Sequence, residues 1–254
     1  MSPVSFDAWP YPLWIAHRGA GKLAPENTLA AFRLGAAHGY RMFECDAKLS
    51  ADGQPFLLHD STLSRTTNAR GPASALSWDE LSRLDAGGWH SRAYTGEPLP
   101  SLQAIARYVK RNGFALNIEI KPSPGSERHT GRVVAEAAAE LWRGEALPPL
   151  LTSFKPEALQ GASEAAPHLP RGLLLDALHG DWVGQAQTLG CVAIVSHYGL
   201  IDAAMVARVR AARMKLLSYT VNDPAEAYRL HGLGVAGLIT DAVDRFTPGP
   251  GVQD

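Results

Sequence analysis

The sequence has few cysteines and no excess of charge of either sign. Its two cysteines, Cys45 and Cys191, lie far apart and outside any CxxC pair, which argues against a disulfide framework and is typical of a reducing compartment. Lysine and arginine together number 24, against 25 aspartate and glutamate residues, so no positive field is available to hold a polyanion. We therefore expect no nucleic-acid partner.

Signals for membranes and for secretion are also missing. No stretch approaches the roughly 20 apolar residues of a membrane-spanning helix. No lysine or arginine precedes the short apolar run near the N-terminus, and Pro10 and Pro12 interrupt that run, which argues against a signal peptide. We expect a soluble, cytoplasmic protein without stable membrane association, either a monomer or a homodimer.

Short apolar runs with β character alternate with helical patterns along the 254 residues. This alternation indicates βα units around a parallel sheet, and the length suits one TIM-type (β/α)8 barrel. The predicted strands are 13–18, 42–47, 56–60, 116–121, 150–154, 172–176, 192–197, 215–221 and 237–240. The predicted helices are 29–38, capped by Asn27 or Thr28, then 101–112, 133–142, 202–214 and 224–234.

An eight-stranded barrel leaves one of these nine runs over, and connection length identifies it. The second run continues to residue 50 and the third begins at Pro55, so only residues 51–54 lie between them, whereas a parallel crossover needs about a dozen residues. The pair is therefore predicted to be a β-hairpin with Asp52-Gly53 as its two-residue turn, which sets His59 opposite Asp46. Residues 61–100 are too long for a simple connection and predict a small insertion over the barrel mouth, within a single domain of residues 1–254.

Three acidic side chains share the inner face of two predicted strands. Glu44 and Asp46 alternate with apolar residues on one strand, as do Glu119 and Lys121 on another. The outward face of a barrel strand packs on helices, so these polar side chains must point inward, where an unpaired charge is costly. Carboxylates without His or Cys favour Mg²⁺ or Ca²⁺. The alternative is a set of ordinary ion pairs with Lys48 and Lys121.

Two histidines are expected at the same end of the barrel. His17 and Arg18 end the first strand, where the rim of a barrel collects catalytic groups. Taken alone, His17 is more typical of a structural residue, but the hairpin brings His59 to the same rim. Two imidazoles would then lie beside a carboxylate-bound cation, with Arg18 and Lys121 as hydrogen-bond donors to an anion. This set supplies what phosphoryl transfer needs.

Four other residues have two interpretations each. His197 follows a strand and either lines the mouth or lies on the surface. Asp241 is a rim carboxylate or, by our preferred interpretation, a helix N-cap. Phe154 and Tyr219 either pack in the core or form a wall for a substrate.

These motifs together resemble the glycerophosphodiester phosphodiesterase family over nearly the whole chain. The matching residues are His17-Arg18-Gly19, Pro25-Glu26-Asn27-Thr28, Glu44-x-Asp46, Asp52-Gly53, His59-Asp60, Glu119-Ile120-Lys121, Ser153-Phe154, Tyr219-Thr220-Val221-Asn222 and 237–241. Among its members, the chain looks most similar to the cytoplasmic bacterial enzymes associated with glycerol-3-phosphate uptake. It departs from the pattern at Tyr219, where many relatives have Trp, and at Ala242, where many have Pro.

The resemblance implies a TIM-type barrel with a capping insertion and one divalent cation. It implies hydrolysis of glycerophosphodiesters, such as glycerophosphocholine, to sn-glycerol 3-phosphate and an alcohol. The implied roles are metal binding by Glu44, Asp46 and Glu119, acid and base catalysis by His17 and His59, phosphate binding by Arg18 and Lys121, and support of these groups by Glu26.

Two other functions are compatible with the same rim residues. A related barrel phosphodiesterase of the phospholipase D or phospholipase C type would need an apolar or basic face for its membrane substrate, and residues 77–89 offer little of either. A catalytically inactive barrel that only binds glycerophosphodiesters would not need both histidines and all three carboxylates.

Overall fold

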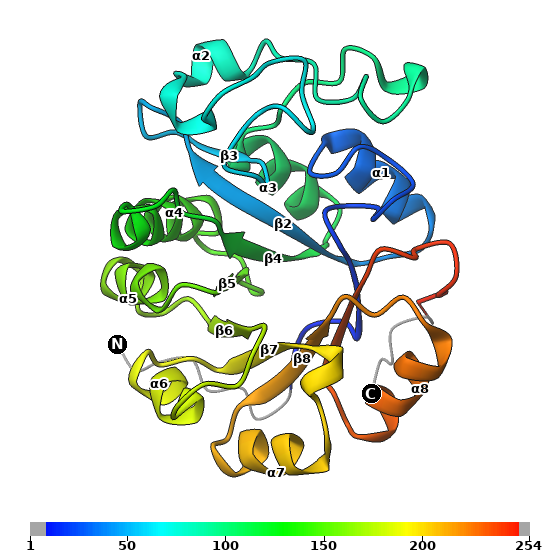
Figure 1. Ribbon diagram of the computed structural model, residues 1–254, viewed down its shortest axis with the longest axis vertical. Coiled ribbons are helices and arrows are strands. Elements are labelled where there is room, and N and C mark those ends of the chain that lie inside the picture. The colour runs from blue at the N-terminus through cyan, green and yellow to red at the C-terminus, as the bar shows by residue number, and fades with distance from the viewer. Residues whose placement is uncertain (1–8, 249–254) are drawn as a thin grey trace.

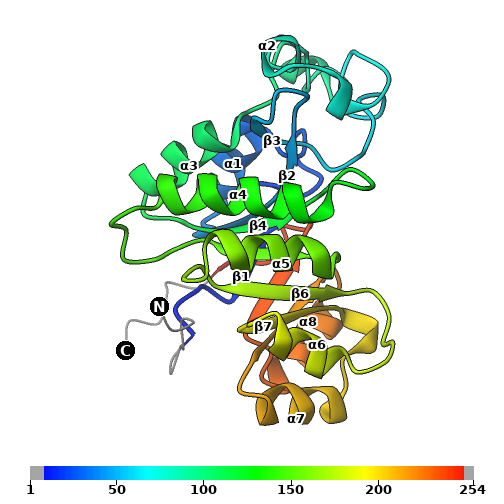
Figure 2. The same cartoon turned by 90° about the vertical axis from the view of Figure 1, so that its left-hand side faces the viewer.

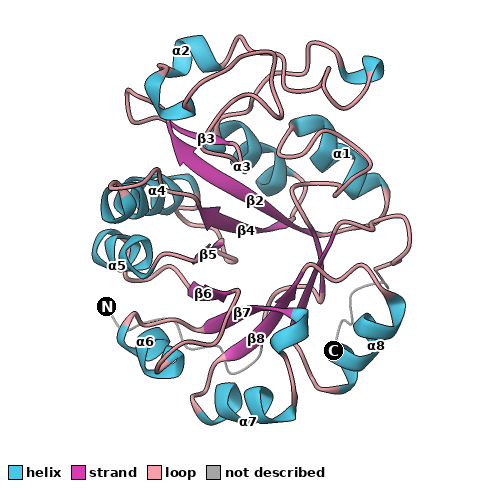
Figure 3. Cartoon of the chain, in the orientation of Figure 1, coloured by secondary structure: helices cyan, strands magenta, loops and turns pink. Residues whose placement is uncertain are grey.

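The computed structural model describes residues 9–248, and eight parallel strands form a closed ring surrounded by helices (Figures 1 and 3). The ring closes because β1 pairs in parallel with both β2 and β9. Its strands are β1 (Trp14–Ala16), β2 (Met42–Leu49), β4 (Ala115–Ile120), β5 (Leu150–Ser153), β6 (Arg171–Leu175), β7 (Ala193–His197), β8 (Lys215–Tyr219) and β9 (Gly237–Thr240). The predicted TIM-type barrel is confirmed. Residues 1–8, which include the start of the segment interpreted as lacking a signal peptide, lie outside the described range.

Seven helices of the described chain lie outside the ring between the strands (Figure 1). They are α1 (Leu29–Ala37), α3 (Leu102–Arg111), α4 (Glu127–Leu141), α5 (Pro156–Ala165), α6 (Trp182–Thr188), α7 (Ala203–Ala211) and α8 (Pro224–Gly232). Residues 9–248 contain no helix long and apolar enough to cross a membrane.

The sequence did not predict α5 or α6, and for α5 the reason is packing. A Cβ atom on Gly161 of α5 would lie 2.0 Å from the carbonyl oxygen of Arg128, and one on Gly131 of α4 would lie 1.9 Å from that of Ala158. Glycine therefore lets the two helices approach closely, although it weakens the helical signal of the sequence.

The strand faces separate apolar from polar side chains as predicted. Phe43 and Cys45 of β2 face outward and pack in one core cluster with Phe32 of α1. A second apolar cluster, which includes Ile15 and Leu217, fills the barrel interior. The polar face of β2 therefore points into the ring. Both cysteines are buried and free.

The extra strand is β3 (Pro55–Leu57), which pairs antiparallel with β2, so the predicted hairpin is confirmed. Its predicted register is wrong by one residue. Leu57 lies opposite Ala47, and the Leu58 amide donates to the Asp46 carbonyl at 3.0 Å, so His59 is not opposite Asp46. The cause is a three-residue loop: Gly53, at φ +80°, donates its N–H to the Ser50 carbonyl and extends the turn by one position.

Residues 61–100 follow the hairpin and include the short helix α2 (Trp78–Leu81). Figures 1 and 2 show this segment at one end of the molecule, beyond β3. It packs on Phe56 and Leu58 of the hairpin through an apolar cluster of its own, which includes Leu63, Leu81 and Leu99. The division of the chain into one domain with this insertion stays a prediction.

Candidate active site

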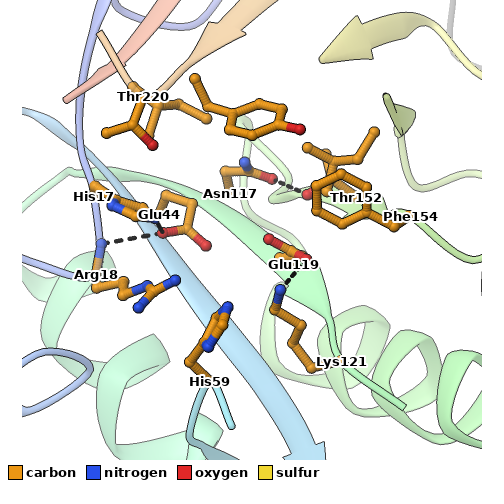
Figure 4. A pocket seen from close by; sticks show the side chains of 13 residues that line it. His17, Arg18, Glu44, His59, Asn117, Glu119, Lys121, Thr152, Phe154 and Thr220 are labelled. Carbon is orange, nitrogen blue, oxygen red and sulfur yellow. Dashed lines mark hydrogen bonds and ion pairs between the residues drawn. The ribbon is translucent and has the colours of Figure 1, made fainter. Parts of the chain in front are cut away.

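A pocket of about 180 Å³ opens at the carboxyl ends of the barrel strands (Figure 4). Six of the residues predicted to carry catalysis, metal binding or phosphate binding line it, and the seventh, Asp46, is fully buried beside Glu44 and Glu119. None of the lining residues belongs to the described segment 61–100. The lining residues are His17, Arg18, Glu44, His59, Asn117, Glu119, Lys121, Thr152, Phe154, Leu174, Tyr219, Thr220 and Ile239.

The three acidic side chains converge. Glu44, Asp46 and Glu119 each place a carboxylate oxygen within 4.8 Å of the others, and all three residues are buried. Glu44 Oε1 and Asp46 Oδ1 accept no hydrogen bond from the described chain. Lys121 Nζ lies 2.7 Å from Glu119 Oε1 and 3.6 Å from Asp46 Oδ1. Buried oxygens without donors fit a hard divalent cation, for which carboxylates are the preferred ligands.

The electrostatics of the cluster also fit a cation. Burial first, and then the negative charge of Asp46, raise the pKa of Glu119 to about 7. Burial and both neighbouring carboxylates raise the pKa of Glu44 well above its ordinary value. For Asp46 burial acts in the same direction, but Arg18 and Lys121 outweigh it and lower the pKa to about 2. Burial and mutual repulsion thus disfavour the ionised forms of Glu44 and Glu119, and a bound cation would favour them.

Two residues of the β1–α1 loop orient these carboxylates. Asn27 Nδ2 donates to Asp46 Oδ2 at 2.8 Å, and the Asp46 amide donates to Asn27 Oδ1 at 3.0 Å. The amide of Arg18 donates to Glu44 Oε2 at 3.0 Å. The helix cap is Thr28, whose hydroxyl accepts from the Ala31 amide, so Asn27 holds a carboxylate instead of capping α1.

His17 is held by a residue whose role the sequence missed. His17 Nδ1 lies 2.6 Å from Asp241 Oδ1, while Nε2 lies 3.7 Å from Glu44 Oε2. Asn222 fixes Asp241 by accepting from its amide at 2.8 Å. The predicted helix N-cap at Asp241 is wrong, because the described chain after β9 makes a turn and no helix. A carboxylate on Nδ1 leaves Nε2 for proton transfer. The signals for Asp241 in the sequence were its place just after a barrel strand and its inclusion in the motif at residues 237–241.

His59 has the same kind of partner. Its Nδ1 lies 2.7 Å from Asp60 Oδ1, and Asp60 is also ion-paired with Arg65. Burial lowers the pKa of His59 more than the charge of Asp46 raises it. The observed register differs from the predicted one by one residue, but the imidazole of His59 still borders the pocket.

Basic side chains and aromatic rings line the rest of the pocket. In Figure 4, Glu44 and Glu119 point toward each other, with Arg18 on one side and Phe154 on the other. The rings of Phe154 and Tyr219 meet edge to face, with centroids 5.7 Å apart.

Two of the predicted pocket residues are not among those that line the cavity. His197 contacts Tyr219 edge to face, with ring centroids 6.0 Å apart. Glu26 lies behind Arg18 and accepts from its Nη1 at 2.9 Å.

Residues 17–245 match the Glycerophosphoryl diester phosphodiesterase family. A glycerophosphodiester phosphodiesterase of Caldanaerobacter subterraneus is 32% identical over 90% of this chain and 93% of its own length. A phosphodiesterase of Oleispira antarctica, solved in complex with the product sn-glycerol-3-phosphate, has a TM-score of 0.84 and 35% identity over 91% of this chain and 93% of that one. A glycerophosphodiester phosphodiesterase of Agrobacterium tumefaciens has a TM-score of 0.77 and 27% identity over 92% and 97%.

Proposed function

This chain belongs to the Glycerophosphoryl diester phosphodiesterase family of phosphoric diester hydrolases, and from that premise we propose that it converts glycerophosphodiesters, such as glycerophosphocholine and glycerophosphoethanolamine, to sn-glycerol 3-phosphate and an alcohol. The observation that carries the proposal is one pocket bordered by two histidines and by a buried cluster of three carboxylates. The product in the similar Oleispira structure supports the glycerol phosphate half of the substrate.

We propose Glu44, Asp46 and Glu119 as the ligands of one divalent cation, Mg²⁺ or Ca²⁺. The buried oxygens without donors and the raised pKa values of Glu44 and Glu119 support this assignment. When bound, the cation supplies positive charge that stabilises the negative charge developing on the phosphate oxygens.

Arg18 and Lys121 are proposed to bind the phosphodiester. Both cations line the pocket next to the carboxylate cluster. Their N–H groups donate to the nonbridging phosphate oxygens and hold the phosphorus in line with the attacking oxygen. Because Glu26 and Asp46 already contact the Arg18 guanidinium, its position is set before substrate arrives.

His17 and His59 are proposed to move the two protons of the reaction. One imidazole takes the proton of the attacking hydroxyl, which belongs to the glycerol of the substrate, and the other gives a proton to the departing alcohol oxygen. Water then opens the resulting cyclic phosphate to sn-glycerol 3-phosphate. Asp241 and Asp60 support these roles, since each contacts Nδ1 and fixes the ring orientation. Phe154 and Tyr219 exclude water from the opposite wall of the pocket.

The test is direct measurement of sn-glycerol 3-phosphate released from glycerophosphocholine and glycerophosphoethanolamine. The wild type should release it. The control is His17→Ala, purified in the same way, which should release it at no more than about a hundredth of that rate. If the wild type cleaves other phosphodiesters but neither of these, the substrate assignment fails.

A further inference from the structure

Arg65 of the 61–100 segment lies between two carboxylates that each hold a different part of the site. Its Nε lies 2.7 Å from Asp60 Oδ2, and its Nη2 donates to Asp60 Oδ1 at 3.0 Å. Its Nη1 and Nη2 donate to Glu26 Oε2 and Oε1, both at 2.7 Å. One guanidinium therefore makes two bidentate ion pairs, the strongest geometry that Arg and carboxylate adopt.

Each of the two carboxylates has its second partner in the pocket. Asp60 Oδ1, which accepts from Arg65, also lies 2.7 Å from His59 Nδ1. Glu26 Oε1 accepts from both Arg65 Nη2 and Arg18 Nη1. Two short chains of contacts thus run from Arg65, one to a proposed proton carrier and one to a proposed phosphate ligand.

The backbone that carries Arg65 is well anchored, although 44% of its side chain is exposed. Leu63 is fully buried in the apolar cluster that the segment shares with the hairpin. Thr67 closes the turn, with its hydroxyl donating to the Leu63 carbonyl at 2.7 Å. The backbone at Arg65 is therefore held in place by packing and hydrogen bonding, which limits the positions that the guanidinium can take.

The guanidinium of Arg65 lowers the pKa values of both carboxylates. Hydrogen bonds from Arg65 lower the pKa of Asp60 far below its ordinary value. Burial would raise the pKa of Glu26, but the hydrogen bonds of Arg65 and the charge of Arg18 outweigh it and lower the pKa. Both carboxylates stay ionised and available to their pocket partners.

We propose that Arg65 is a positioning residue that joins the two sides of the site, holding His59 through Asp60 and Arg18 through Glu26. The segment 61–100 then serves the reaction through this side chain without lining the pocket. The inference rests on the proposed function. A lysine can replace Arg65 only in part, because a point charge with no planar fork cannot make both bidentate pairs.

The test combines kinetics with product binding in single and double variants. Arg65→Ala should lower kcat by about ten- to a hundredfold and weaken binding of sn-glycerol 3-phosphate, measured by calorimetry, by about three- to tenfold. Arg65→Lys should fall between this variant and the wild type. The matched control is Arg83→Ala in the same segment, whose exposed pair with Asp79 touches nothing in the pocket, and which should leave both values unchanged.

The double variants distinguish positioning from general loosening of the fold. With Asp60→Asn already present, Arg65→Ala should lower kcat by less than about twofold more but still weaken product binding. With Glu26→Gln present, the pattern should reverse: kcat falls, and product binding hardly changes. Where Arg65→Ala does not fold, Arg65→Lys takes its place in both cycles.

Two results would overturn the inference. One is unchanged kcat and product binding in the Arg65 variants of an active enzyme. The other is an equal further loss in both backgrounds, which would mean that Arg65 only stabilises the fold. A wild type that releases no sn-glycerol 3-phosphate would instead defeat the proposed function, and this inference with it.

Discussion

Replacing Glu119 with Gln should change how the stability of the metal-free protein depends on pH. The pKa of Glu119 is raised from 4.5 to about 7, so between these pH values the native state keeps a proton that the unfolded chain releases. The contribution of this carboxyl group to the free energy of unfolding therefore falls as pH rises through that window. Gln has no proton to lose and removes the dependence.

The interval between 4.5 and about 7, at about 1.4 kcal/mol per pKa unit, corresponds to an upper limit of about 3 kcal/mol. Metal-free Glu119→Gln should thus match the wild type at about pH 4 and exceed it by up to this amount at about pH 8. Mg²⁺ at about 1,000 times its Kd should invert the order, because it would stabilise the wild type by about 4.1 kcal/mol, which exceeds this limit.

The assay is urea unfolding of chelator-treated wild type and Glu119→Gln at several pH values, with and without added Mg²⁺. Comparing the two proteins cancels the titration of groups that do not interact with Glu119. If the difference in unfolding free energy between the wild type and Glu119→Gln does not change between about pH 5 and about pH 8, the raised pKa of Glu119 is refuted. Equal stabilisation of both proteins by Mg²⁺ would refute the assignment of Glu119 as a ligand of the cation.

Four further substitutions give separate predictions. His17→Ala and His59→Ala should each lower kcat by about two to four orders of magnitude while the thermal midpoint stays within a few degrees; near-normal turnover in either would remove that histidine from the mechanism. Asp241→Asn should lower kcat by about tenfold or more with KM little changed, measured by steady-state kinetics, and an altered KM with normal kcat would argue against its hold on His17. Gly131→Ala should cost about 1 to 3 kcal/mol of unfolding free energy in urea, because its Cβ would meet the Ala158 carbonyl, and an unchanged midpoint would contradict that close packing.

Much of the barrel could be predicted because its signals are local. Alternation within β2 and β4 shows which side chains share a face of the strand. In a closed ring covered by helices, the polar face must be the inner one. The short connection before β3 allowed only a hairpin. Its register could not be predicted, because a left-handed Gly53 lengthens the loop by one residue and the dipeptide Asp52-Gly53 suits both loops.

Two of the contacts that support the site join distant parts of the chain, whereas His59 is held by the adjacent Asp60. His17 and Asp241 are 224 positions apart, and Glu26 and Arg65 are 39 apart. An aspartate after a strand is commonly a helix cap, so local statistics favoured the wrong role for Asp241. The ring closure between β1 and β9 is what brings it to His17.

The central claim is that the three carboxylates bind a divalent cation that the reaction requires. The most direct test measures sn-glycerol 3-phosphate release from glycerophosphocholine by chelator-treated protein, before and after titration with Mg²⁺ or Ca²⁺. The account predicts that turnover is lost on chelation and returns as one cation binds per chain, in the wild type but not in Glu119→Gln. Full turnover by the metal-free protein would contradict it.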